Sequence, residues 1–270
     1  MRRWFRNSLV VLMSAVIVLL HVSCASTVMT GARSRVIAHR GGASLAPENS
    51  IAAIRSAMVL GVDAVEIDVR MSADGKAVVF HDKKVDRKTD GKGVVNELLF
   101  EELRSLSLLL PDGGVSDERI PLLDEVLAFV DGRCQVLIEV KDGDSGVEAA
   151  VIDAVARHGA GDWVAVQAFN DEVLERFRDL GVTFPLEKLF VFKLPLLPYV
   201  YDGKFCRFSM EKYDYISSFN IKKKYARKGL LRKIKRAGKG VKVWTLEPGD
   251  EVSPELVDWV ITDYPQSFLP

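Results

Sequence analysis

Two histidines of this sequence each end a short apolar segment and are followed at once by a charged residue. His39 follows Val-Ile-Ala and precedes Arg40, and His81 follows Ala-Val-Val-Phe and precedes Asp82. Two imidazoles in one site suit general acid–base chemistry near neutral pH, because one can accept a proton while the other donates one. The guanidinium of Arg40 adds a fork of donors that matches phosphate oxygens. These residues therefore predict an acid–base site that also binds phosphate.

A pair of carboxylates lies between the two histidines in the sequence. Glu66 and Asp68 alternate with valine and isoleucine residues, and period-two alternation predicts a strand with both carboxylates on one face. A helix is expected over residues 51–60, with Asn49 or Ser50 as its N-cap, so the strand belongs to a parallel βαβ unit buried on both faces. Two buried acids repel each other unless a cation lies between them. Ca²⁺ and Mg²⁺ prefer oxygen ligands, so the pair predicts a divalent-cation site.

Strands alternate with helices along most of the chain, which is typical of a parallel β architecture. Eight strands are expected, ending at His39, residues 68–70, Lys141, Phe169, Phe192, Phe219, Leu246 and Asp263. Further helices are expected over residues 121–130, 146–158, 171–180 and 222–237. We therefore predict an α/β fold, a (β/α)₈ TIM barrel, with the strand that ends at His81 as an additional one. Residues 83–118 are rich in charge and glycine, and their length predicts an insertion.

Short motifs in a fixed order resemble those of the glycerophosphodiester phosphodiesterases. They are His39-Arg40-Gly41, Pro47-Glu48-Asn49-Ser50, Glu66-Ile67-Asp68-Val69, Asp74-Gly75 and His81-Asp82. The resemblance continues at Ile138-Glu139-Val140-Lys141, Gln167-Ala168-Phe169, Val243-Trp244-Thr245 and Ile261-Thr262-Asp263-Tyr264-Pro265. It implies one barrel domain over residues 33–270, of the exported bacterial type, with residues 83–118 as a small subdomain over the barrel mouth.

The resemblance implies metal-dependent hydrolysis of a glycerophosphodiester to glycerol phosphate and an alcohol. His39 and His81 would serve as general acid and general base, with the two assignments left open. One divalent cation, Ca²⁺ or Mg²⁺, would be held by Glu66, Asp68 and Glu139.

The resemblance also implies residues that contact the substrate. Arg40, Lys141 and Trp244 would bind the substrate and its phosphate. Glu48 and Asp82 would support the site from beside it, Asp82 by orienting His81.

Two alternatives to this function stay open. The first is lysophospholipase D or phospholipase-type cleavage of lipid phosphodiesters, which the apolar, aromatic residues 193–210 would suit as a lipid-facing loop. The second is a non-catalytic surface lipoprotein that binds ligands. The complete set of histidines and carboxylates favours an enzyme.

Residues 1–24 predict an export leader. Three arginines precede an apolar run over residues 8–20, which is short for a transmembrane helix. Val22-Ser23-Cys24 resembles the end of a bacterial lipobox, although His21 stands where leucine is usual. We expect a protein of the bacterial cell envelope, anchored by a lipid on Cys24 or by the leader, with a periplasmic or secreted protein as the alternative.

The charge balance and the cysteines limit which other classes of protein this sequence can represent. The chain has 37 basic and 37 acidic residues, which argues against a nucleic-acid-binding protein that relies on global positive charge. Residues 222–242 hold eleven Lys or Arg and no acid, which predicts either a membrane-facing patch or a solvated helix face. Cys134 and Cys206 do not make a disulfide framework, and we expect both to be unpaired.

Overall fold

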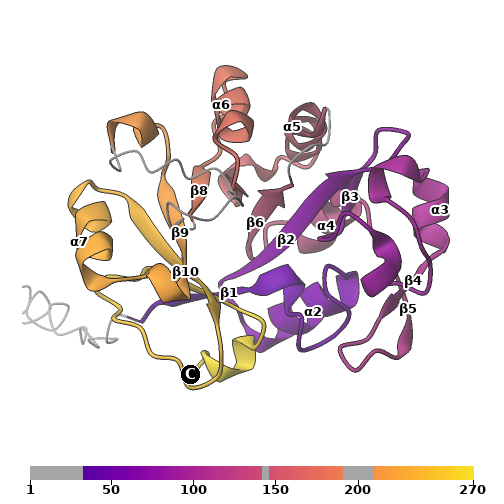
Figure 1. Ribbon diagram of the computed structural model, residues 1–270, viewed down its shortest axis with the longest axis horizontal. Coiled ribbons are helices and arrows are strands. Elements are labelled where there is room, and N and C mark those ends of the chain that lie inside the picture. The colour runs from indigo at the N-terminus through magenta and orange to yellow at the C-terminus, as the bar shows by residue number, and fades with distance from the viewer. Residues whose placement is uncertain (1–32, 142–145, 191–209) are drawn as a thin grey trace, which may run out of the picture. The chain divides into compact units, whose positions relative to one another are not determined.

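Eight parallel strands close into a barrel. They are β1 (Arg35–Ala38), β2 (Ala64–Met71), β6 (Gln135–Val140), β7 (Val164–Ala168), β8 (Leu186–Phe190), β9 (Ser218–Lys222), β10 (Gly240–Leu246) and β11 (Trp259–Thr262). Neighbours follow the order β1-β11-β10-β9-β8-β7-β6-β2, and β1 also pairs with β2, which closes the sheet. The expected (β/α)₈ barrel is thus confirmed. The computed structural model describes residues 33–141, 146–190 and 210–270 (Figure 1).

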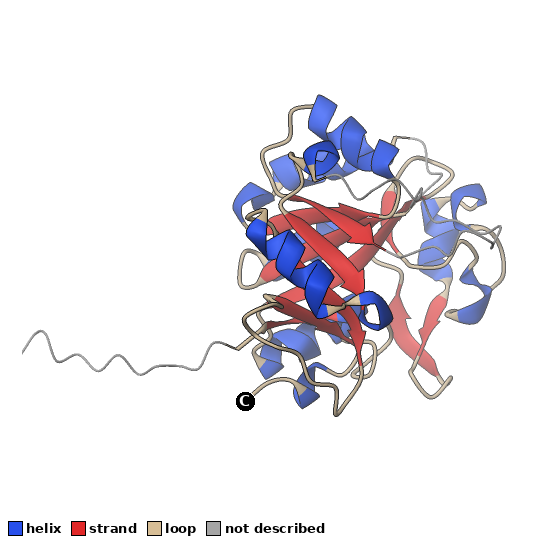
Figure 2. Ribbon diagram, turned by 60° about the vertical axis from the view of Figure 1, so that its left-hand side comes forward, coloured by secondary structure: helices blue, strands red, loops and turns tan. Residues whose placement is uncertain are grey.

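The helices lie outside the strands, as Figure 2 shows in blue and red. They are α2 (Ile51–Leu60), α3 (Phe100–Ser105), α4 (Leu123–Val130), α5 (Val147–Arg157), α6 (Asp171–Asp179) and α7 (Lys228–Arg236). Ser50 caps the start of α2, where its side chain accepts a hydrogen bond from the Ala53 amide, and Gly61, in the left-handed conformation, caps its end. The main core lies between the strands and these helices and includes Val65, Ile67 and Val69.

The strand that precedes His81 runs in the opposite direction to the barrel strands. β3 (Ala77–Val79) pairs antiparallel with β2, with Val69 opposite Val79 and Met71 opposite Ala77. The additional strand that was expected to end at His81 is therefore present, but it ends at Val79 and is antiparallel to the barrel strands. β2 extends to Met71, and β3 runs back alongside it from Ala77 to Val79. His81, two residues after β3, therefore lies near the carboxyl-terminal half of β2.

Two predicted boundaries near the C-terminus were displaced. The strand expected to end at Phe219 is β9, which runs to Lys222, because Ser218 is in register with Glu187 of β8 and Gly240 of β10. The helix expected from residue 222 begins at Lys228, since Lys223–Tyr225 forms a separate 3-10 turn.

The segment between β3 and α4 has a small core of its own. It contains α3, the antiparallel strands β4 (Ser107–Leu109) and β5 (Val115–Arg119), and the 3-10 turns Val85–Arg87 and Val95–Glu97. A separate apolar cluster holds it against β3, formed by Val78, Phe80, Val85, Val95, Leu103, Leu108 and Ile120. Further 3-10 turns are His39–Gly41, Ala160–Asp162, Glu211–Tyr213 and Pro265–Ser267. Among the described residues, no helix is long and apolar enough to cross a membrane.

Candidate active site

Three carboxylates from two neighbouring strands meet at the carboxyl end of the barrel. Glu66 and Asp68 come from β2 and Glu139 from β6, and the register places Asp68 opposite Glu139. One oxygen of each carboxylate lies within 4.8 Å of the others, and all three side chains are buried. Three converging carboxylates match the ligand preference of Ca²⁺ or Mg²⁺.

The charges of this cluster are only partly balanced by protein cations. Lys141 forms ion pairs with Asp68, at 2.7 Å from Oδ1, and with Glu139. Burial alone would raise the pKa of Asp68, but Lys141, His81 and Arg40 outweigh burial and lower it. Burial and the charge of Asp68 raise the pKa of Glu66 to about 8. Burial likewise raises the pKa of Glu139, although Lys141 opposes the shift.

The donor set therefore fits a divalent cation. Asp68 Oδ1 is buried and accepts no hydrogen bond, although Lys141 Nζ lies close to it. A carboxyl group whose pKa is raised by neighbouring carboxylates is one that a cation would help to ionise. Both features are expected of carboxylate groups that coordinate a metal ion.

A tight turn after β1 positions the backbone of Arg40 over the cluster. The Arg40 amide donates to Glu66 Oε2 at 2.8 Å, with Arg40 itself in the left-handed region at φ 52°. Gly41 follows at φ 77°, and a Cβ atom there would lie 2.9 Å from Ile54 Cγ1. Only glycine combines that backbone angle with so close an approach. The Gly-Gly pair thus fixes the turn that aims Arg40.

Asn49 positions Asp68, one of the three carboxylates of the cluster. Its Nδ2 donates to Asp68 Oδ2 at 2.8 Å, and its Oδ1 accepts the Asp68 amide at 3.0 Å. Ser50 is the N-cap of α2, so Asn49 is free for this contact. Sequence reasoning assigned Asn49 to helix capping and missed its bonds to Asp68.

His39 is bound to Asp263, which the sequence did not single out as a site residue. The distance between His39 Nδ1 and Asp263 Oδ1 is 2.6 Å, and His39 Nε2 lies 3.9 Å from Glu66. A carboxylate only accepts, so Nδ1 carries the proton and Nε2 faces the site. Burial would lower the pKa of His39, but Glu66 and Asp263 outweigh it and raise the pKa. The closure of the barrel explains this contact. Ala38 of β1 pairs with Thr262 of β11, and His39 and Asp263 directly follow these two residues.

His81 has a carboxylate partner in its own neighbour. Its Nδ1 lies 2.6 Å from Asp82 Oδ1, and Arg87 from the segment after β3 makes two hydrogen bonds to Asp82. Although burial opposes it, the hydrogen bonds from Arg87 and His81 lower the pKa of Asp82 to about 2. Burial lowers the pKa of His81 despite the nearby charge of Asp68.

Glu48 joins the phosphate-binding candidate Arg40 to the segment after β3. It accepts from Arg40 Nη1 at 2.9 Å and pairs with Lys88 Nζ at 2.8 Å, and it is buried. Burial would lower the pKa of Arg40, but Asp68 and Glu48 outweigh it and raise the pKa, so the guanidinium stays charged. Neither Lys88 nor Arg87 was predicted from sequence.

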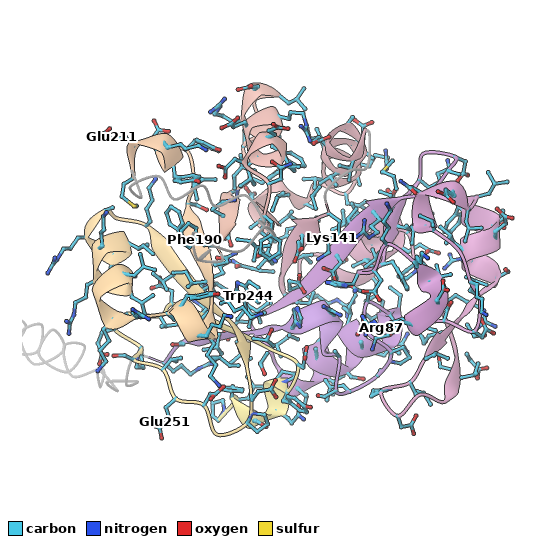
Figure 3. All side chains as sticks on the ribbon, viewed as in Figure 1. Arg87, Lys141, Phe190, Glu211, Trp244 and Glu251 are labelled. Atoms are coloured by element: carbon cyan, nitrogen blue, oxygen red, sulfur yellow. The ribbon has the colours of Figure 1, made fainter. Side chains whose placement is uncertain are left out.

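Trp244 lies at the carboxyl end of β10, on the far side of Lys141 from Arg87 (Figure 3). Its indole nitrogen donates to the Asn220 carbonyl at 2.9 Å, and its ring meets Phe169 edge-to-face at 5.7 Å. It packs against the apolar cluster of Ile37, Ala64, Leu137 and Ile261 inside the barrel. Its ring is half-buried, which leaves part of it accessible beside the mouth.

A chain of buried polar side chains runs from the metal-site candidates through the barrel interior. Gln167 donates to Glu66 at 3.3 Å, and Asn220 donates both to Gln167 at 2.7 Å and to Glu187 at 2.8 Å. Lys242 ends the chain with a 2.7 Å ion pair to Glu187. All five side chains are buried.

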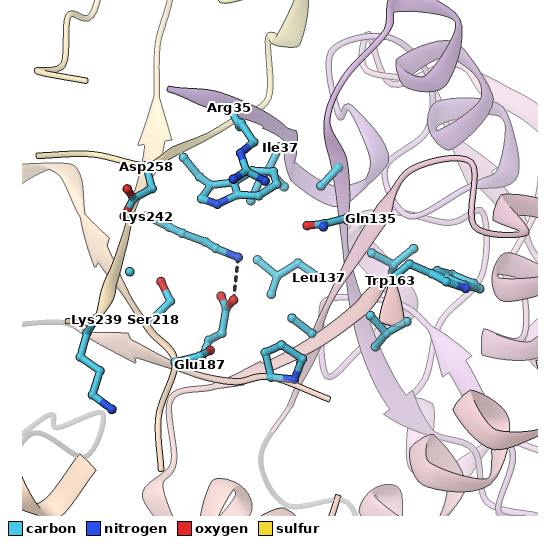
Figure 4. A pocket seen from close by; sticks show the side chains of 18 of the residues that line it. Arg35, Ile37, Gln135, Leu137, Trp163, Glu187, Ser218, Lys239, Lys242 and Asp258 are labelled. Atoms are coloured by element: carbon cyan, nitrogen blue, oxygen red, sulfur yellow. Dashed lines mark hydrogen bonds and ion pairs between the residues drawn. The ribbon is translucent and has the colours of Figure 1, made fainter. Parts of the chain in front are cut away.

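The far end of this chain lines a cavity of about 490 Å³ at the opposite mouth of the barrel. Figure 4 shows the Lys242–Glu187 pair there, with Gln135, Leu137 and Ser218 around it. These residues are near the amino-terminal ends of their strands, where a TIM barrel builds stability rather than catalysis. The cavity is therefore separate from the carboxylate and histidine site.

The chain is similar to known proteins over most of its length. The model of the glycerophosphoryl diester phosphodiesterase family matches residues 39–267. A glycerophosphodiester phosphodiesterase of Caldanaerobacter subterraneus is 31% identical over 245 residues, which span 88% of this chain and 97% of the relative.

Solved structures of the same kind are also similar. A glycerophosphodiester phosphodiesterase from Agrobacterium tumefaciens has a TM-score of 0.68 at 25% identity, covering 87% of this chain and 99% of that one. A phosphodiesterase from Oleispira antarctica, solved in complex with the product sn-glycerol-3-phosphate, has a TM-score of 0.74 at 26% identity, covering 87% and 95%.

Proposed function

This chain belongs to the glycerophosphoryl diester phosphodiesterase family and is a phosphoric diester hydrolase, and we propose that its hydrolysis uses a divalent cation and two histidines. The substrate is a glycerophosphodiester, and the products are glycerol phosphate and an alcohol. The observation that carries the proposal is the convergence of three buried carboxylates, two cationic side chains and two carboxylate-bound histidines at one end of the barrel.

Glu66, Asp68 and Glu139 would hold the cation. A divalent cation supplies Lewis-acid stabilisation to the phosphoryl oxygens when it is bound. Arg40 and Lys141 lie against the same carboxylates, so their charges would also face a bound phosphodiester. Glu48 holds the guanidinium of Arg40 in a fixed orientation.

The two histidines would move the protons. Each carries its Nδ1 proton toward a carboxylate, Asp263 or Asp82, so each Nε2 is the nitrogen that can exchange a proton. One accepts a proton from the attacking oxygen, either of water or of the adjacent glycerol hydroxyl; attack by the hydroxyl forms a cyclic glycerol phosphate, which water then opens to glycerol phosphate. The other donates a proton to the alkoxide that leaves as the phosphorus–oxygen bond breaks.

Release of choline from glycerophosphocholine and from lysophosphatidylcholine tests this function, because the same cleavage leaves glycerol phosphate from the first substrate and lysophosphatidic acid from the second. The assay is run with Ca²⁺, with Mg²⁺ and with a chelator. We expect metal-dependent release from the soluble diester. Turnover of the lipid alone would instead support the phospholipase alternative, whose proposed loop over residues 193–210 falls almost entirely outside the described residues. Equal release in chelator would refute the metal proposal.

We propose from the sequence that the chain is exported and anchored through Cys24. Residues 1–24, like Cys206, lie outside the described residues. Mass spectrometry of the protein from a bacterial host tests it: a diacylglyceryl adduct on Cys24 is expected, and an intact unmodified Cys24 would contradict it.

A further inference from the structure

Positive charge is concentrated in one segment of the chain. Residues 222–242 contain eleven of the 37 basic residues and none of the 37 acidic residues. The rest of the sequence therefore holds 26 basic residues against 37 acidic ones. So uneven a distribution gives one face of the protein a sign opposite to that of the remainder.

Part of this charge is neutralised within the fold, and part is not. Lys223, Lys235 and Lys242 pair with Asp250, Asp258 and Glu187 respectively. Six other cations are exposed and form no ion pair with any carboxylate of the described residues; we call them the basic face: Lys222, Lys224, Arg227, Lys228, Arg232 and Arg236.

The basic face lies on the outside of the barrel. Leu231 and Ile234 of α7 are buried against the strands, so Lys228, Arg232 and Arg236, which are spaced four residues apart, share a different side of that helix. Figure 1 shows α7 outside the strands, beside β10. Lys222 ends β9 at the rim of the active-site mouth, with its ammonium 5.5 Å from the Trp244 ring.

We propose that the basic face docks on an anionic phospholipid surface. A planar array of anionic headgroups complements a helix side that carries several lysines and arginines and no acid. Nucleic-acid sites commonly interleave basic residues with exposed aromatic rings for base stacking. The exposed positions of α7 carry no aromatic residue, and the two half-buried rings beside the rest of the basic face, Tyr225 and Trp244, already lie against Lys224 and Lys222. A predicted export leader also brings the chain to a membrane. Docking does not depend on the proposed catalytic residues.

Docking of this kind has a defined strength and salt dependence. Each Lys or Arg held near an anionic surface strengthens binding about fivefold, so removal of three charges should weaken it about 100-fold. Because the Debye length shortens from about 10 Å at 0.1 M salt to about 3 Å at 1 M, binding should weaken steeply with salt.

The test is co-sedimentation of the full chain with phosphatidylcholine vesicles that contain, or lack, 30% phosphatidylglycerol. Any attachment through the apolar residues 8–20 is common to both vesicles, so the readout is the extra binding that phosphatidylglycerol produces. The variant combines Lys228→Gln, Arg232→Gln and Arg236→Gln, because glutamine keeps the helix and removes only charge. We expect the extra binding to fall about 100-fold.

A matched control removes the same charge elsewhere. Lys76→Gln, Lys84→Gln and Lys92→Gln alter three exposed lysines without ion pairs in the described residues. This control should keep the extra binding within about twofold, and both triple variants should hydrolyse a soluble diester as the parent does. Equal losses in the two variants, or no extra binding by the parent, would overturn the proposal. Equally tight binding of a single-stranded oligonucleotide would overturn the assignment to lipid.

Discussion

Glu66→Gln tests both the metal site and the electrostatics from which it was inferred. Burial and the charge of Asp68 raise the pKa of Glu66 from its ordinary 4.5 to about 8 when no cation is bound. The folded protein then holds a proton that the unfolded chain releases between these two values. This proton stabilises the fold fully below pH 4.5, and the stabilisation is lost as the pH rises to about 8.

The size of the effect follows from that shift. One pKa unit corresponds to about 1.4 kcal/mol, so metal-free wild-type protein should lose about 4 kcal/mol of this stabilisation between pH 5 and pH 8.5. Glutamine is always neutral and cannot lose it. The variant gives up one of the hydrogen bonds from the Arg40 amide and Gln167, which costs about 1 kcal/mol at every pH. The difference in stability between variant and wild type should therefore shift by about 4 kcal/mol in favour of the variant.

Urea unfolding followed by tryptophan fluorescence, at pH 5 and pH 8.5, measures this difference. With chelator, the variant should become the more stable protein at pH 8.5. With Ca²⁺ or Mg²⁺, wild type should regain stability while the variant does not, and the variant should not release glycerol phosphate from glycerophosphocholine. Glu101→Gln, at an exposed position, is the control and should follow wild type. A variant that loses stability with pH as wild type does would refute the pKa reasoning. A variant that is active and still inhibited by chelator would refute the ligand set.

Three further substitutions probe contacts that support the site. Asp263→Asn removes the carboxylate beside His39 Nδ1, so the pKa of His39 should fall and kcat should drop by about 10²-fold or more; an unchanged pH–rate profile would contradict the proposed orienting role. Lys242→Met leaves Glu187 buried without a cation and should lower the free energy of unfolding by about 3–5 kcal/mol, most of it restored by adding Glu187→Gln, whereas a loss below 1 kcal/mol would mean that the pair contributes little. Asn49→Ala removes both hydrogen bonds to Asp68 and should weaken metal binding, measured by calorimetry, about 10- to 100-fold; unaltered affinity would exclude the positioning role.

The sequence predicted those parts of the site that depend on local periodicity. The alternation around Glu66 and Asp68 places both carboxylates on the face of β2 opposite the valines and isoleucine that pack under the helices, and the structure has this arrangement. Glu139 of β6 and Lys141, which directly follows that strand, are likewise two residues apart, and they contact each other. Side chains alternate between the two faces of a strand with a period of two residues, so the sequence alone predicts which of them share a face.

Hydrophobic periodicity could not predict the contacts between residues that are far apart in the sequence. His39 and Asp263 are 224 positions apart and meet only because β1 and β11 are neighbours in the closed barrel. Lys88 and Arg87 reach Glu48 and Asp82 through the conformation of a turn that no pattern specifies. The direction of the additional strand before His81 could not be predicted either, because antiparallel and parallel strands show the same apolar pattern over so short a length.

The interior of the barrel shows why the carboxylate cluster can tolerate its burial. Inward positions of such barrels are usually filled by branched apolar residues, yet here Glu66, Gln167, Asn220, Glu187 and Lys242 occupy connected positions. Each amide of the chain both donates and accepts, so no polar atom between Glu66 and Glu187 depends on water from the opposite mouth. Because a half-satisfied buried network is more costly than an apolar core, these residues must be retained or replaced together. The orientation of Glu66 is thus set by side chains from four other strands, which is a global property of the closed barrel.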